Sequence, residues 1–155
     1  MHPDPLSICA FQRLDPRTTT SGLLRDEDLT ALAAIGVRQV VNLALDSHPE
    51  ALVDEAGKLA ALGIGYTHIP VPFDDPSDAH YRAFVAALAA AGDAPVHVHC
   101  IMNYRVSAFF FRWHREFAGM DGARARRLMA QQWEPDRSDR PETRPWAEFL
   151  ARTGI

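Results

Sequence analysis

The sequence predicts one α/β domain over residues 1–155, with three layers in which helices cover both faces of a mainly parallel sheet. Short β-branched segments alternate with helical segments of ten or more residues, and this alternation requires parallel pairing through crossover helices. The length of 155 residues is that of one domain. The composition, 47% hydrophobic and 23% charged, is that of an ordinary globular protein.

Turn and capping residues divide the first half of the chain. The expected elements are a strand at 7–13, a turn at 15–22, a helix at 25–35, a strand at 39–43 and a helix from about 47 to 63. Gly36 and Gly63 end the two helices, because glycine is favoured just after a helix C-terminus. Ser47 and Glu50 match a capping box, so the second helix is expected to begin there.

The second half repeats the alternation of strands and helices. The expected elements are strands at 66–71 and 95–99 and helices at 75–92, 103–118, 121–133 and 145–152. Asp75 precedes Pro76 directly, which is typical of a helix N-cap followed by proline in the first turn.

Composition excludes several classes of function. The net charge of −4 argues against nucleic acid as the main partner. No apolar run approaches the roughly 20 residues that a membrane helix needs, and the first residues lack the features of a signal peptide. We therefore expect a cytoplasmic protein that is not bound to a membrane, while the oligomeric state stays open.

Cofactor and metal sites are not expected. The two cysteines, Cys9 and Cys100, lie too far apart for a disulfide framework and have no zinc-type spacing. His97 and His99 share one face of a predicted strand, but no third ligand lies at a suitable spacing.

Cys100 is the strongest candidate for chemistry, because it stands where a predicted strand gives way to a helix. Backbone N–H groups and a helix N-terminus at such a turn bind anions and favour a thiolate. Arg105 would hold phosphoryl oxygens, Ser107 would donate a hydrogen bond to the sulfur, and His99 would bond to the loop backbone. The alternative is that Cys100 is a small buried hydrophobic residue.

The segment around Cys100 resembles the phosphate-binding loop of the cysteine-dependent phosphatases, the protein tyrosine and dual-specificity superfamily. Further segments resemble a compact bacterial branch, related to the phosphatase-like domain fused to some β-lactamase-like hydrolases: Ser21-Gly22, Asp28-Leu29, 36–43, 105–109, 133–135 and Trp146. The resemblance implies a dual-specificity-type fold. It also implies hydrolysis of phosphate monoesters through a phosphocysteine, with the amides of Ile101, Met102, Asn103, Tyr104 and Arg105 around the phosphate.

The loop departs from the superfamily signature. That signature has five residues between cysteine and arginine, with a central glycine and a Ser or Thr after the arginine, whereas here four residues separate Cys100 from Arg105. A gap-free alignment places Asn103 at the glycine and Val106 at the arginine. Asparagine tolerates the left-handed backbone that glycine provides. On this alignment Arg105 is displaced by one residue, and only its long side chain could bring the guanidinium to the anion. The other reading is a shortened loop with fewer N–H groups and a narrower cradle.

A general acid is expected ahead of the cysteine strand, and two adjacent carboxylates are available. Asp74 has no evident structural duty and is the preferred acid, whereas Asp75 is better explained as the helix cap.

Three functions remain open from the sequence. The first is a phosphatase acting on a phosphorylated small molecule or a phosphoprotein, with phosphotyrosine as one candidate substrate. The second is a domain that binds phosphate or sulfate without turnover. The third is rhodanese-like sulfur transfer, because rhodanese loops are shorter than phosphatase loops.

Overall fold

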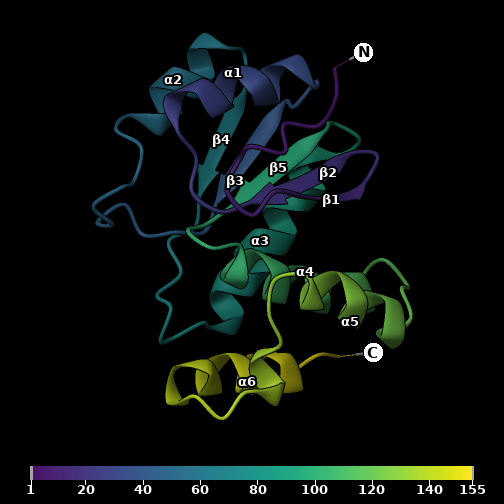
Figure 1. Cartoon of the computed structure of the whole chain (residues 1–155). Coiled ribbons are helices and arrows are strands. Elements are labelled where there is room, and N and C mark those ends of the chain that lie inside the picture. Colours follow the sequence, from purple (N-terminus) through teal and green to yellow (C-terminus); the bar gives the residue numbers. More distant parts are fainter. Residues whose placement is uncertain (1, 155) are drawn as a thin grey trace.

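The computed structural model describes residues 2–154 and contains a five-stranded sheet between two layers of helices (Figure 1). The strands are β1 (Gln12–Asp15), β2 (Thr18–Ser21), β3 (Gln39–Asn42), β4 (Gly65–His68) and β5 (Val96–His99). Their order is β1-β2-β5-β3-β4. Only β1 runs antiparallel to its neighbour among these strands. The predicted α/β class with a mainly parallel sheet is confirmed.

The helices divide between the two faces of the sheet. On one side lie α1 (Asp26–Ala34) and α2 (Glu55–Ala61); on the other lie α3 (Asp78–Ala91), α4 (Tyr104–Glu116), α5 (Gly122–Ala130) and α6 (Arg144–Ala151), as Figure 1 shows. Two short 3-10 helices, η1 (Pro135–Arg137) and η2 (Pro141–Thr143), connect α5 to α6. No helix within residues 2–154 combines the length and the apolar character needed to cross a bilayer.

Two predictions for the N-terminal region were wrong. The first strand is Gln12–Asp15 rather than 7–13, and residues 18–21 of the expected turn form β2. The turn itself is confined to the residues around Pro16, where the backbone N–H of Arg17 donates to Asp15 Oδ1 (2.8 Å). The threonines that follow are buried, because they pair with β1 on one side and β5 on the other.

The start of α2 was also predicted wrongly. His48 Nδ1 accepts a hydrogen bond from the backbone N–H of Glu50 (3.1 Å), so the Ser47–Glu50 motif makes a local turn rather than a helix. The cap is Asp54, whose side chain accepts from the backbone N–H of Gly57. The expected strand at 66–71 is shorter in the structure and ends at His68, two residues before Pro70, which has no N–H to donate.

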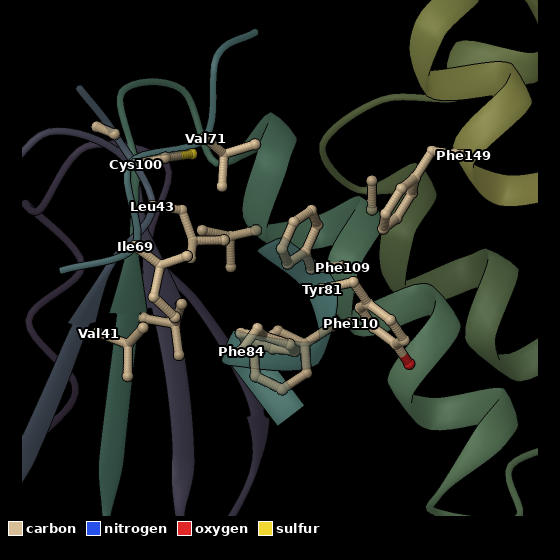
Figure 2. Packing of buried hydrophobic residues seen from close by; sticks show 14 of the residues in the cluster. Val41, Leu43, Ile69, Val71, Tyr81, Phe84, Cys100, Phe109, Phe110 and Phe149 are labelled. Atoms are coloured by element: carbon tan, nitrogen blue, oxygen red, sulfur yellow. The ribbon is translucent and has the colours of Figure 1, made fainter. Parts of the chain in front are cut away.

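The larger apolar core lies between the sheet and the helices α3, α4 and α6 (Figure 2). Phe84 of α3 and Phe109 of α4 are fully buried and pack edge-to-face, with ring centroids 5.4 Å apart. They lie beside Val41 and Leu43 from the centre of the sheet. Because this core joins β5 to α4, it positions the turn that connects them.

Candidate active site

Residues 100–103 connect the end of β5 to the start of α4, at the edge where the parallel strands end. Ligands bind at this edge in open α/β sheets. Gly22, just after β2, allows a close approach, because a Cβ atom there would lie 2.4 Å from the carbonyl oxygen of Ile101. The neighbouring Leu23 donates its backbone N–H to that oxygen (3.0 Å). The segment after β2 therefore fixes the start of the turn.

Asn103 fixes the end of the turn. Its backbone is left-handed (φ +66°), as expected for a residue that replaces glycine, and it is the N-cap of α4. Its Nδ2 donates to the carbonyl oxygen of Ala10 (2.9 Å) and to Thr20 Oγ1 (3.0 Å). Ala10 is itself left-handed (φ +50°), a conformation that costs energy in a residue with a Cβ atom. These two bonds join the end of the turn to the N-terminal part of the chain.

The backbone N–H groups of residues 101–106 donate to no protein acceptor in the described part of the chain. The first N–H bonded in this region is that of Ser107, which donates to the carbonyl oxygen of Asn103 (3.1 Å). Successive unpaired amides at a helix N-terminus carry partial positive charge. The turn can therefore bind an anion through its backbone.

Arg105 is the second residue of α4 and carries a guanidinium close in sequence to these amides. Its side chain lies over the ring of Phe73, with Cζ 5.4 Å from the ring centroid, and only 9% of the residue is exposed. Its Nε is buried without a hydrogen-bond partner. Within residues 2–154 no carboxylate forms an ion pair with it. A buried cation without a counter-ion is costly, and a bound anion would remove that cost.

Val106 does not take the place of the arginine. It is fully buried and belongs to the larger apolar core. Val106 therefore offers no polar group to the turn, and Arg105 is the basic side chain next to it in sequence.

Cys100 is 1% exposed, and its sulfur points toward Val71 at one end of the larger core (Figure 2). The residue also lines a small pocket together with Asn42, Glu55, His99 and Ile101. The volume of this pocket, about 10 Å³, suits at most one water molecule. Cys100 thus stands at the border between the core and the turn.

Two expected supporting contacts are not formed. The hydroxyl of Ser107 donates to the carbonyl oxygen of Tyr104 (3.0 Å) rather than to sulfur, because Ser107 lies inside α4. His99 does not bond to the loop backbone: its Nε2 lies 2.6 Å from Oε2 of Glu55. Nor is His97 free for a metal, since Thr19 and Ser21 engage both of its ring nitrogens.

Asp74 lies at an exposed turn beside Phe73. The turn is anchored by Trp146, whose Nε1 donates to the carbonyl oxygen of Phe73 (2.7 Å). Asp75 is not the cap of α3; Ser77 is, and its Oγ accepts from the backbone N–H of His80 (3.1 Å). Pro76 therefore lies before the helix rather than inside its first turn.

A groove of about 310 Å³ adjoins the turn. Its walls carry Phe73, Tyr104 and Trp133, and the rings of Tyr104 and Trp133 stack with centroids 4.6 Å apart and planes 8° apart. Arg140 and Glu142 lie at its exposed rim. Phe73 also contacts Arg105, so the groove and this guanidinium share one wall.

Two of these residues were not predicted from the sequence. Glu55 lies in a stretch expected to be an ordinary helix interior, and its pairing with His99 depends on the sheet order. Phe73 directly precedes Asp74, and an aromatic residue beside a candidate acid could have indicated a substrate-binding surface.

Comparisons with known proteins identify the family and the fold. The model of the phosphatase-like domain of beta-lactamase hydrolase-like proteins matches residues 11–113. No curated protein matches the chain. A candidate phosphatase (DUF442) from Shewanella putrefaciens is 29% identical, with a TM-score of 0.82 over 98% of each chain.

Two more distant structures share the fold. TpbA of P. aeruginosa in complex with phosphotyrosine is 20% identical, with a TM-score of 0.73 over 99% of this chain and 88% of the other. PTPMT1 in complex with PI(5)P is 16% identical, with a TM-score of 0.70 over 92% of this chain and 96% of the other.

Proposed function

Because the chain belongs to the family of the phosphatase-like domain of beta-lactamase hydrolase-like proteins, we propose that it is a cysteine-dependent phosphatase acting on phosphate monoesters, with phosphotyrosine as a candidate substrate. The observation that carries this proposal is the buried Arg105, without an ion-pair partner in residues 2–154, beside the unpaired amides of residues 101–106. Both features favour an anion with several oxygens, as a phosphoryl group has.

In the proposed reaction the thiolate of Cys100 attacks phosphorus. The S–P bond forms as the bond from phosphorus to the leaving oxygen breaks, and Asp74 donates its proton to that oxygen. The amides of residues 101–105 and the guanidinium of Arg105 stabilise the charge on the non-bridging oxygens. A water molecule then attacks phosphocysteine, Asp74 takes up a proton, and phosphate leaves as the thiolate is restored. No cofactor enters these steps.

The leaving group is proposed to lie in the groove beside Tyr104. A flat aryl group fits walls formed by Phe73, Tyr104 and Trp133, since aromatic rings pack favourably against one another. The phosphotyrosine bound to TpbA has a leaving group of this kind.

Aryl phosphate hydrolysis distinguishes the proposed activity from sulfur transfer. With p-nitrophenyl phosphate and thiosulfate plus cyanide as parallel substrates, we expect release of p-nitrophenol and no thiocyanate. The readout is absorbance in both assays. Thiocyanate formation without hydrolysis would instead assign rhodanese-like chemistry, and phosphate binding with neither product would leave a binding domain.

Asp74→Asn is expected to lower kcat by about 100-fold on an alkyl or phenyl phosphate, whose leaving oxygen needs a proton. The effect should be smaller on p-nitrophenyl phosphate, because p-nitrophenolate leaves without protonation. Steady-state kinetics with both substrates measures the difference. Asp75→Asn is the matched control, since Asp75 is the adjacent exposed carboxylate. A larger loss in Asp75→Asn would transfer the acid role to Asp75.

A further inference from the structure

A chain of buried polar side chains lies next to the turn, and the proposed mechanism uses none of them. It contains Gln12 of β1, Thr20 of β2 and Asn103 at the end of the turn, all of which are buried. Polar side chains at such depth are costly unless they are hydrogen-bonded. Their partners therefore show what holds this part of the site in place.

The hydrogen bonds fix the orientation of the Asn103 amide. Thr20 Oγ1 donates its single hydrogen to the carbonyl oxygen of Gln12 (3.1 Å), so it can only accept from Asn103 Nδ2 (3.0 Å). The second hydrogen on Nδ2 is donated to the carbonyl oxygen of Ala10 (2.9 Å). Asn103 Oδ1 is buried and has no partner in residues 2–154. The two bonds from Nδ2 are therefore the hydrogen bonds that hold this side chain.

The polar chain continues from the β1–β2 hairpin to the end of α5. Gln12 Nε2 donates to the carbonyl oxygen of Leu128 (2.9 Å), and Gln12 Oε1 accepts from Gln132 Nε2 (2.9 Å). Gln132 Nε2 also donates, at 3.5 Å, to the carbonyl oxygen of Ala10 that accepts from Asn103. Gln132, two residues after α5, is thus connected to Asn103 through the N-terminal part of the chain.

A second contact joins the next residues of the same two segments. Tyr104 follows Asn103, and Trp133 follows Gln132. The rings of Tyr104 and Trp133 stack on each other, and both line the groove. Residues 103–104 are therefore joined to residues 132–133 directly by the ring stack and indirectly by the polar chain.

This double connection links the two places where the parts of the proposed substrate would bind. The turn offers its amides to the phosphoryl group, and the groove is proposed to receive the leaving group. Gln132 is not among the groove-lining residues of the described chain. Removal of one member of a buried hydrogen-bond network leaves its neighbours unpaired. A change at Gln132 is consequently expected to reach the turn through Gln12 and Thr20.

We propose that Gln132 and Thr20 are positioning residues, which hold the turn and the stacked wall of the groove in one arrangement by acting through Asn103. Their effect on substrate binding rests on the proposed phosphatase activity. Their effect on the turn does not, because opening of the turn exposes Cys100 and can be measured without a substrate.

The first test measures alkylation of Cys100 by iodoacetamide, in a Cys9→Ser background so that one thiol remains. Thr20→Val keeps the shape of the side chain but removes the hydroxyl that accepts from Asn103. Cys100 is 1% exposed, so the reagent reaches it when the turn opens. We expect alkylation to become about tenfold faster, the effect of breaking a buried hydrogen bond. Rates are compared at the plateau of the pH profile, where they report access rather than ionisation.

Two other variants separate the hydroxyl from the rest of the side chain. Thr20→Ser restores the hydroxyl and should react at the parental rate. Thr18→Val is the matched control, because Thr18 is buried on the same face of β2 and takes no part in the polar chain. It should also react at the parental rate.

The second test changes Gln132 and asks whether the effect reaches the turn. Gln132→Met keeps the length of the side chain but cannot donate to Gln12 Oε1. We expect alkylation of Cys100 to become about fivefold faster. The inhibition constant of inorganic phosphate, measured against p-nitrophenyl phosphate, should rise by a similar factor. The change in kcat should be smaller, because a bound phosphoryl group orders the amides again.

Gln131→Met is the matched control for this substitution, since Gln131 is the exposed neighbour. It should leave both measurements unchanged. Combining Thr20→Val with Gln132→Met should give less than the product of the two single effects, because both residues belong to one network. Thermal unfolding checks that each variant is folded, and Gln132→Met carries the test alone if Thr20→Val does not fold.

Unchanged alkylation in both Thr20→Val and Gln132→Met would overturn the inference, even in a protein that hydrolyses phosphate esters. Equal acceleration by Thr20→Ser and Thr20→Val would overturn it as well, since the hydroxyl would then have no part in the effect. Faster alkylation in a protein that neither binds nor hydrolyses phosphate would refute the proposed function and retain the network.

Discussion

Cys100→Ser is expected to reduce aryl phosphate hydrolysis by about 10⁴-fold or more, since single removal of a covalent nucleophile has effects of this size. A serine hydroxyl is not ionised at neutral pH, so it is a much weaker nucleophile than a thiolate. The two side chains have nearly the same shape, and the residue is 1% exposed in a packed site, so the fold should persist. Release of p-nitrophenol under saturating substrate measures the loss.

The Cys9→Ser variant is the matched control, because Cys9 is an exposed thiol. It should retain full activity. Calorimetric titration of Cys100→Ser with inorganic phosphate should still show binding through the amides and Arg105. Hydrolysis that persists at the parental rate in Cys100→Ser would refute covalent catalysis by this residue.

Arg105→Lys is expected to lower kcat/KM by about 10³-fold, the upper range for loss of one preorganised donor group. Lysine keeps the positive charge and an aliphatic stem against Phe73, but it cannot offer two parallel N–H groups to two phosphoryl oxygens. Phosphate affinity, measured by calorimetry, should fall as well. The loss thus tests geometry rather than charge.

Arg127→Lys provides the control for this substitution, since Arg127 is exposed on α5, away from the turn. It should behave like the parent in both measurements. A loss of less than about tenfold in Arg105→Lys would mean that the guanidinium does not contact the phosphoryl group in the transition state.

The sheet and its helices were largely predictable because their signals are local. The β-branched segments of β3 and β5 are recognisable from their own residues, and Gly36 and Gly92 mark the ends of α1 and α3. β2 was missed because four polar residues, Thr18–Ser21, look like a turn until pairing with β1 and β5 buries them. The start of α2 was missed because a His48 side chain competes for the amide that a capping box would use.

The candidate site was likewise predictable only where its residues are adjacent in sequence. The segment from Cys100 to Arg105 is continuous in sequence, so its place between a strand and a helix could be predicted from local signals. The partner of His99 could not, because Glu55 is brought to it by the order of strands in the sheet. Ser107 was misplaced since its hydroxyl finds a carbonyl one helical turn earlier, which a linear motif does not reveal.

The bonds from Asn103 to Ala10 and Thr20 connect the N-terminal segment and hairpin to the turn after β5. More than eighty residues separate the two ends of each bond, and both bonds hold the residue at the end of the proposed phosphate-binding turn. Substitutions in this hairpin, far from the proposed nucleophile in sequence, are therefore expected to alter that turn. Deletion of the N-terminal segment through Thr20 would remove both bonds to Asn103, while every proposed catalytic side chain would remain in the chain.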